Sequence, residues 1–207
     1  MPACINRGME SPFDILNQQL NAEGINPRSK ESREWFLKQM STIAGGSYDQ
    51  DKVINQPPAK KVAMPAPGKM YLFYYHPKGE ETLPYYDRFP LILMVDISKG
   101  GMTGLNLHYL PINLRQNLFY SLLNRISGKK MDEDTRIRMT YNFLQDNRAV
   151  KEYRPCFKRY LTKNIKGNIA QIPASEWEIA VHLPLASFEK RSESFVHRES
   201  QKKIESF

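Results

Sequence analysis

The chain has 207 residues, of which 41% are hydrophobic and 11% aromatic. This supports one folded core with extensions, or two small domains, and it excludes a wholly disordered chain. The 30 Lys and Arg residues outnumber the 22 Asp and Glu residues, for a formal net charge of +8. Such an excess favours a polyanionic partner, although many assembly proteins are modestly basic without one.

No apolar run approaches the roughly 20 residues of a membrane span, so no membrane partner is expected. The first residues carry charge without the apolar stretch of a signal peptide. Cys4 and Cys156 lie far apart and away from other metal-ligating residue types. The sequence therefore predicts a reducing compartment, with neither a disulfide framework nor a zinc site.

Residues 1–46 are predicted to form a helical N-terminal arm. Ser11-Pro12 places a capping residue before a proline at the first helical position. A short apolar stripe follows, formed by Ile15, Leu16 and Leu20. A second start signal, Asn26-Pro27, precedes a helix that Gly45-Gly46 ends. The shared face of that helix holds Phe36, Leu37 and Met40.

Residues 47–67 are predicted to be a linker, because prolines recur there with little periodicity. A linker after short helices suggests an arm that reaches a neighbouring molecule. An arm that folds back on its own domain is equally compatible with the pattern.

Residues 68–190 are predicted to form the globular body. Met70–Tyr75 and Leu91–Val95 are continuously apolar, as in strands covered on both faces. From Leu105 to Tyr109 apolar residues alternate with Asn106 and His108, which predicts a half-exposed strand. Short turns between these segments predict a small antiparallel sheet or a barrel-like body.

Helices are expected to follow the strands, which makes the fold class α+β. The strongest signal recurs every fourth residue, at Leu114, Leu118, Leu122 and Ile126. Asp132-Glu133-Asp134 favours the start of a second helix. Its buried stripe would be Ile137, Tyr141 and Leu144. Ser175–Glu178 has the spacing of a capping box, and residues 191–207 form a charged C-terminal tail.

A search for catalytic motifs finds no phosphate-binding loop, dinucleotide fingerprint or nucleophile elbow. The four histidines are scattered, and His108 is interpreted as a structural residue. The carboxylates nearest to a metal-binding cluster are Glu80, Glu81, Asp87 and Asp96. Glu80 and Glu81 lie in a predicted turn, where ordinary solvated charges are the better interpretation. Asp87 and Arg88 are expected to form an ion pair. No catalytic residue, metal or cofactor is predicted.

A basic segment is the main candidate for binding nucleic acid or an acidic partner. Its cations are Lys151, Arg154, Lys158, Arg159, Lys163 and Lys166. Interleaved aromatics such as Tyr160 can stack on bases while the cations neutralise phosphates. Phe157, Tyr160 and Leu161 also have helical spacing, so they could be core residues behind a solvated face.

Two long strings resemble small structural proteins of T4-like contractile-tailed phages. They are Leu83–Leu91 and Gly104–Pro111, within a resemblance that runs from about Gly68 to His197. The resemblance implies a non-enzymatic virion protein, assembled in the host cytoplasm, of the DNA-end protector or head-completion type. A tail or baseplate position is also compatible. The implied partners are other virion proteins, in several copies of a symmetric assembly, and DNA.

The first string has a physical interpretation of its own. Pro84 and Pro90 restrict the backbone on both sides of an aromatic loop. Its interface candidates are Tyr85, Tyr86, Asp87, Arg88 and Phe89. The alternative is that these residues cap the core of their own domain. Two hypotheses therefore stand: an assembly protein with termini that become ordered on neighbours, and a DNA-binding protein that covers genome ends.

Overall fold

The computed structural model describes residues 11–45, 48–126, 133–147, 150 and 153–205. Its centre is an antiparallel six-stranded sheet. In spatial order the strands are β1 (Lys60–Val62), β7 (Ile165–Ile172), β2 (Met70–Tyr75), β4 (Leu91–Ser98), β5 (Gly101–Asn106) and β6 (Phe157–Leu161). A second, two-stranded sheet pairs β3 (Tyr86–Asp87) with β8 (Phe188–Glu189). The predicted α+β fold is confirmed in its open-sheet form, and the described strands form no closed barrel.

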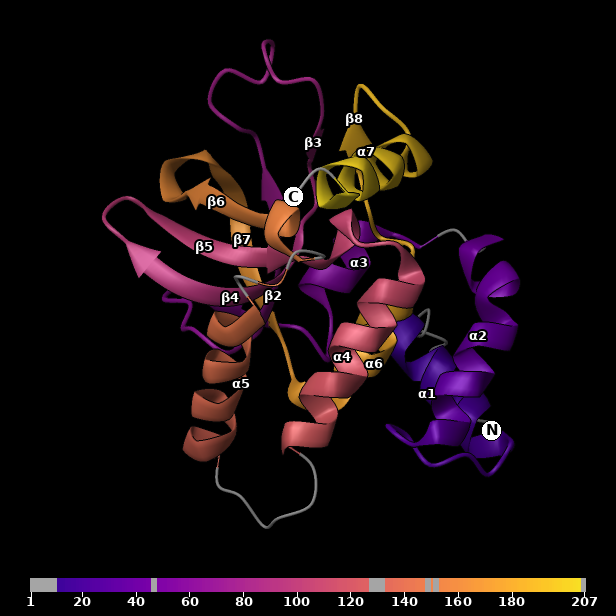
Figure 1. The fold of residues 1–207 in the computed structure, drawn as a ribbon. Helices are drawn as coiled ribbons and strands as arrows, with labels where there is room; N and C mark the ends of the chain where they lie inside the picture. The colour runs from indigo at the N-terminus through magenta and orange to yellow at the C-terminus, as the bar shows by residue number, and fades with distance from the viewer. Residues whose placement is uncertain (1–10, 46–47, 127–132, 148–149, 151–152, 206–207) are drawn as a thin grey trace, which may run out of the picture.

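Helices pack beside the sheet (Figure 1). They are α1 (Pro12–Ala22), α2 (Lys30–Gly45), α3 (Gln50–Asn55), α4 (Ile112–Ile126), α5 (Glu133–Asn147), α6 (Trp177–His182) and α7 (Glu193–Glu205). The N-terminal helices α1 and α2 lie next to α6 (Figure 1). No helix in the described part of the chain is long and apolar enough to cross a membrane.

The sheet separates two hydrophobic clusters, because successive side chains of a strand point to opposite faces. Met70 and Leu72 of β2 join the larger cluster with the helices. Tyr71 and Phe73 of the same strand join a smaller cluster with Tyr160 of β6. Both strands that were predicted to be covered on both faces, β2 and the first part of β4, are therefore buried on both.

The N-terminal helices begin where the sequence predicts. Ser11 caps α1 by accepting a hydrogen bond from the Asp14 backbone, and the Asp14 side chain completes a capping box. Both predicted apolar faces need correction, since Ile15 is 41% and Leu37 45% exposed. The buried apolar side chains of these helices include Phe13, Leu16, Leu20, Trp35, Phe36 and Ile43.

The range predicted to be an extended linker contains α3 and β1. Asp49 caps α3, and Val53 and Ile54 of this helix are buried in the larger cluster. Strand β1 pairs with β7. Val196 of α7, in the predicted tail, is also fully buried in that cluster. The division into arm, linker, body and tail stays a prediction, and one buried cluster draws residues from all four ranges.

Three local predictions differ from the structure. Strand β5 ends at Asn106, whose side chain accepts a hydrogen bond from the His108 backbone and starts a 3-10 turn, η1 (Leu107–Tyr109). Asn106 and His108 are buried, not half-exposed. The capping box predicted at Ser175–Glu178 is absent from the start of α6, because Glu178 points into the interior and accepts hydrogen bonds from other elements.

The predicted helices α4 and α5 are confirmed, with a changed buried face on α5. Leu144 is buried together with Phe143, and Tyr141 is only partly buried. The side chain of Ile137 and residue Asp132 lie outside the described part.

Candidate nucleic-acid interface

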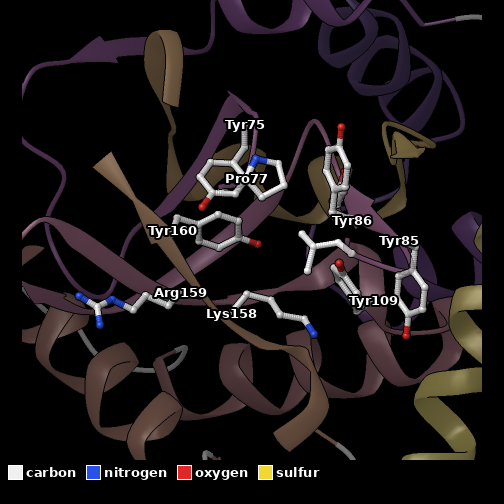
Figure 2. Close-up of a pocket in the computed structure, with 10 residues that line it drawn as sticks. Tyr75, Pro77, Tyr85, Tyr86, Tyr109, Lys158, Arg159 and Tyr160 are labelled. Carbon is white, nitrogen blue, oxygen red and sulfur yellow. The ribbon is translucent and has the colours of Figure 1, made fainter. Parts of the chain in front are cut away.

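A pocket of about 230 Å³ lies where β6 faces the loop between β2 and β3 (Figure 2). It is lined by Tyr75, Pro77, Leu83, Tyr85, Tyr86, Asp87, Tyr109, Lys158, Arg159 and Tyr160. In Figure 1 the loop between β2 and β3 rises above the sheet. The pocket therefore combines the end of a buried strand, an edge strand and a projecting loop.

One wall of the pocket consists of tyrosines from the two strands. The rings of Tyr75 and Tyr160 meet edge to face, with centroids 4.9 Å apart. The ring of Phe73 also meets the Tyr160 ring edge to face, with centroids 5.2 Å apart. The hydroxyl of Tyr75 accepts a hydrogen bond of 3.2 Å from the backbone N–H of Leu161. These contacts hold the wall rigid before any ligand arrives.

The opposite wall is the loop that carries Tyr85 and Tyr86. The ammonium of Lys190 donates to three carbonyl oxygens of this loop, at 2.5, 2.8 and 2.9 Å. The centroid of the Tyr85 ring lies 6.2 Å from that of Tyr109 in η1 and 6.2 Å from that of Phe195 in α7. A segment that would otherwise be a mobile surface loop is thus tied to the region after β8 and to α7.

Lys158 supplies a positive charge inside the pocket. Its Nζ lies 4.3 Å from the centroid of the Tyr109 ring, a cation–π contact. Burial lowers the pKa of Lys158. Among the described residues the ammonium has no carboxylate partner within ion-pair distance. Figure 2 shows Lys158 reaching toward the tyrosines, whereas the guanidinium of Arg159 points away from them.

A buried polar network stands behind the tyrosines. Oδ2 of Asp87 lies 2.8 Å from Nδ1 of His108 and accepts from Asn106 at 3.0 Å. Oδ1 accepts from the backbone N–H groups of Phe89 and Ser187. Asn106 also donates to the Tyr160 hydroxyl at 2.9 Å. Since a carboxylate only accepts, Nδ1 of His108 carries the proton.

The charge of Asp87 is well compensated by this network. Burial alone raises the pKa of Asp87, but the charge of His108 and the hydrogen bonds that Asp87 accepts outweigh it, so the pKa lies below its ordinary value. Nε2 of His108 is buried without a hydrogen-bond partner among the described residues. The network fixes the pocket wall, and within the described part of the chain it leaves Lys158 without a carboxylate partner.

A family model described as phage T4 terminal DNA protecting protein matches residues 13–204. The chain belongs to this family. Comparison with curated proteins and with solved structures gave no match.

Family membership confirms the resemblance to T4-like phage proteins and extends it. The match begins in α1, so the N-terminal helices belong to the region that this family shares. Its description concerns protection of DNA termini, which agrees with the second of the two sequence-based hypotheses. It lends no support to a tail, baseplate or head-completion position.

In this member of the terminal DNA protecting family, the two segments predicted to form a site, the aromatic loop and the basic segment, lie side by side. Tyr85, Tyr86 and Asp87 of the aromatic loop line the same pocket as Lys158 and Arg159 of the basic segment. Lys163 and Lys166 are exposed just beyond β6, and Arg154 is exposed just before it. Lys151 lies outside the described residues.

Two expectations for the aromatic loop are corrected by the contacts. The predicted Asp87–Arg88 ion pair is replaced by Asp87 with His108 and by Arg88 with Glu189, the latter at 3.1 Å. Phe89 is fully buried, and its ring packs on that of Tyr74 with centroids 4.7 Å apart. It therefore takes the alternative role of a core residue.

Sequence reasoning missed Tyr75 and Tyr109 as pocket residues. Tyr75 ends a strand that is apolar throughout, and the alternation around Tyr109 predicts a half-exposed strand, so neither had a pattern that separates a pocket wall from a core. The helical spacing of Phe157, Tyr160 and Leu161 was misleading, since these residues form β6, paired with β5.

The remaining reactive groups offer no second centre in the described part of the chain. No group of three His, Cys, Asp or Glu residues there could hold a metal ion. Cys156 is buried, and burial raises the pKa of its thiol to about 12, so it stays protonated.

Proposed function

We propose that this chain binds the ends of phage DNA and shields them without cleaving them, through the surface around the tyrosine pocket. One observation carries the proposal: a pocket lined by tyrosines holds Lys158, which has no carboxylate partner among the residues that the structure describes, and exposed Lys163 and Lys166 continue the positive charge along the chain. Membership of a family described by protection of DNA termini supports it.

This surface has both chemical components that nucleic-acid binding needs. Lysines neutralise phosphates and release counterions, which gives affinity without sequence preference. Aromatic side chains contact bases of any sequence through their faces. A protein that must cover any genome end benefits from this sequence tolerance.

Virion proteins as partners, several copies and a location in the virion belong to the same proposal. Their support is the family's association with phage DNA, since a protein at a genome end meets whatever holds that end.

The first test is a salt titration of binding to a short linear duplex, comparing wild type with the double variant Lys163→Glu/Lys166→Glu. Both lysines are exposed, so the fold should persist. We expect the slope of log K against log salt to become shallower by about 0.9 for each phosphate that the variant no longer neutralises. Wild type should also slow digestion of the duplex by an exonuclease, and the variant should do so less well.

The matched control is Lys30→Glu/Lys38→Glu, which makes the same charge change on α2, a helix far from β6 in Figure 1. An equal weakening of binding in this control would assign the binding to net charge alone. Salt-independent binding, or no binding at low salt, would remove the proposal.

A further inference from the structure

We propose that the tyrosine pocket receives the terminal nucleotide of a DNA strand, with a phosphate at Lys158 and the base against the tyrosine rings. This inference rests on the proposed function and adds the means by which an end is distinguished from the interior of a duplex.

The environment of Lys158 favours a phosphate as its partner. A partly buried ammonium is normally paired with a carboxylate, because removing its hydration is costly. In the described part of the chain Lys158 lies over the Tyr109 ring with no carboxylate within ion-pair distance, and the one carboxylate that lines the pocket, Asp87, already accepts four hydrogen bonds from other groups. The position therefore fits an anion from outside the chain.

The size of the pocket favours a single nucleotide base. Its volume of about 230 Å³ is below the roughly 300–1,000 Å³ typical of small-molecule sites. It has room for one flat ring system between Tyr85 and Tyr86 on one side and Tyr75 and Tyr160 on the other. A paired and stacked base in a duplex interior cannot enter it. A terminal base can leave its stack at a cost of only a few kcal/mol, less than an interior one.

Two tyrosine hydroxyls of the pocket can supply hydrogen-bond donors. The hydroxyls of Tyr75 and Tyr160 each accept one hydrogen bond from the protein, and their own protons have no acceptor among the described residues. Burial raises the pKa of Tyr160, so its hydroxyl keeps the proton. Both hydroxyls can donate to phosphate or base oxygens.

The experiment compares two duplexes of one sequence, one with open ends and one whose ends are closed by hairpin loops. Wild type should bind the open duplex more tightly. Lys158→Met keeps the length of the side chain and removes its charge, and we expect it to reduce this end preference about tenfold, as removal of a charged hydrogen bond does. Lys163→Met, outside the pocket, should weaken binding to both duplexes and leave their ratio unchanged.

A second measurement needs no variant of the pocket. Iododeoxyuridine at the terminal position should cross-link under light to Tyr85 or another tyrosine of the pocket, as located by mass spectrometry. The same base at an interior position should not. Cross-linking from both positions, or from neither, would overturn the inference even if Lys158→Met failed to fold.

The outcomes separate the two proposals. Equal affinity for open and closed ends, with normal salt dependence, would overturn the pocket inference and leave DNA binding in place. Absence of any DNA binding would overturn both. Displacement of the open duplex by a deoxynucleoside monophosphate, but not by inorganic phosphate, is expected. Binding of the mononucleotide without any end preference would assign the pocket to free nucleotides and reject the DNA terminus.

Discussion

At the scale of single residues, His182 shows how burial selects one protonation state. Its ring stacks on Phe36 with centroids 4.2 Å apart. Nδ1 lies 2.6 Å from the carbonyl oxygen of Glu178, so it donates, and Nε2 accepts from the amide of Gln116 at 2.5 Å. Burial lowers the pKa of His182 from 6.5 to about 4, and the nearby charge of Arg115 acts in the same direction.

The pKa of His182 predicts a pH-dependent stability. Because the folded pKa is below the unfolded one, the unfolded chain binds more protons between pH 6.5 and about 4. The contribution of neutral His182 is complete above this window and is lost as the pH falls through it. We expect a decrease of roughly 3 kcal/mol in the free energy of unfolding. Urea unfolding at stepped pH should show a flatter profile for His182→Gln, whereas exposed His76→Gln should keep the wild-type slope. Equal slopes in all three proteins would contradict this.

At the scale of elements, β5 holds β6 close through a glycine. A Cβ atom on Gly101 would lie 2.6 Å from the carbonyl oxygen of Tyr160. Real Cβ atoms do not approach backbone so closely, and Tyr160 and Lys158 both belong to β6. Lys158 and the Tyr160 wall of the pocket therefore keep their positions because Gly101 in the neighbouring strand has no side chain.

Gly101→Ala is expected to move β6 outward and to lower the free energy of unfolding by about 1–3 kcal/mol, as overpacking does. The preference for open DNA ends should fall with it. Unfolding in urea and the open-to-closed affinity ratio measure the two effects. Ile97→Ala, at an exposed position of the same hairpin, should change stability by less than about 0.5 kcal/mol. A normal end preference in Gly101→Ala would show that the pocket tolerates the shift.

At the scale of the whole molecule, Glu178 connects the N-terminal helices to the body. Its carboxylate accepts from Ser32 of α2, from Tyr120 of α4 and from the backbone N–H of Arg28, at 2.5–2.6 Å. The assembly hypothesis expected termini that are ordered only by neighbours. Instead Phe13 of α1 and Val196 of α7 share the larger hydrophobic cluster with the sheet.

Hydrogen exchange on the free monomer should therefore show protection of α1, α2 and α7. Glu178→Ala leaves one buried and two partly buried donors without their acceptor, and we expect a decrease of about 3–5 kcal/mol in the free energy of unfolding with faster exchange, first in α2. Glu34→Ala, which removes an exposed carboxylate from α2 itself, should leave exchange unchanged. Rapid exchange of α1 and α2 in wild type would favour the mobile-arm hypothesis.

Features that depend on neighbours along the chain can be predicted from the sequence. Apolar residues at every fourth position from Leu114 to Ile126 predicted α4, and the Ser11 cap predicted α1. Continuous apolar runs predicted β2 and β4. The strings around Leu83 and Gly104 indicated the phage family, which the family match confirmed. Local hydrogen bonding and periodicity suffice for these features.

Features that depend on partners distant in sequence are fixed by contacts that form only in the folded chain. Phe157–Leu161 became a strand because β5 offered an edge, against a spacing that also suits a helix. Asp87 paired with His108 instead of its neighbour Arg88, since a buried carboxylate needs donors that reach it inside the core. The basic segment and the aromatic loop meet in one pocket although they belong to different sheets, Tyr86 to β3 and Lys158 to β6, about 70 positions apart in the chain. No local pattern encodes that meeting.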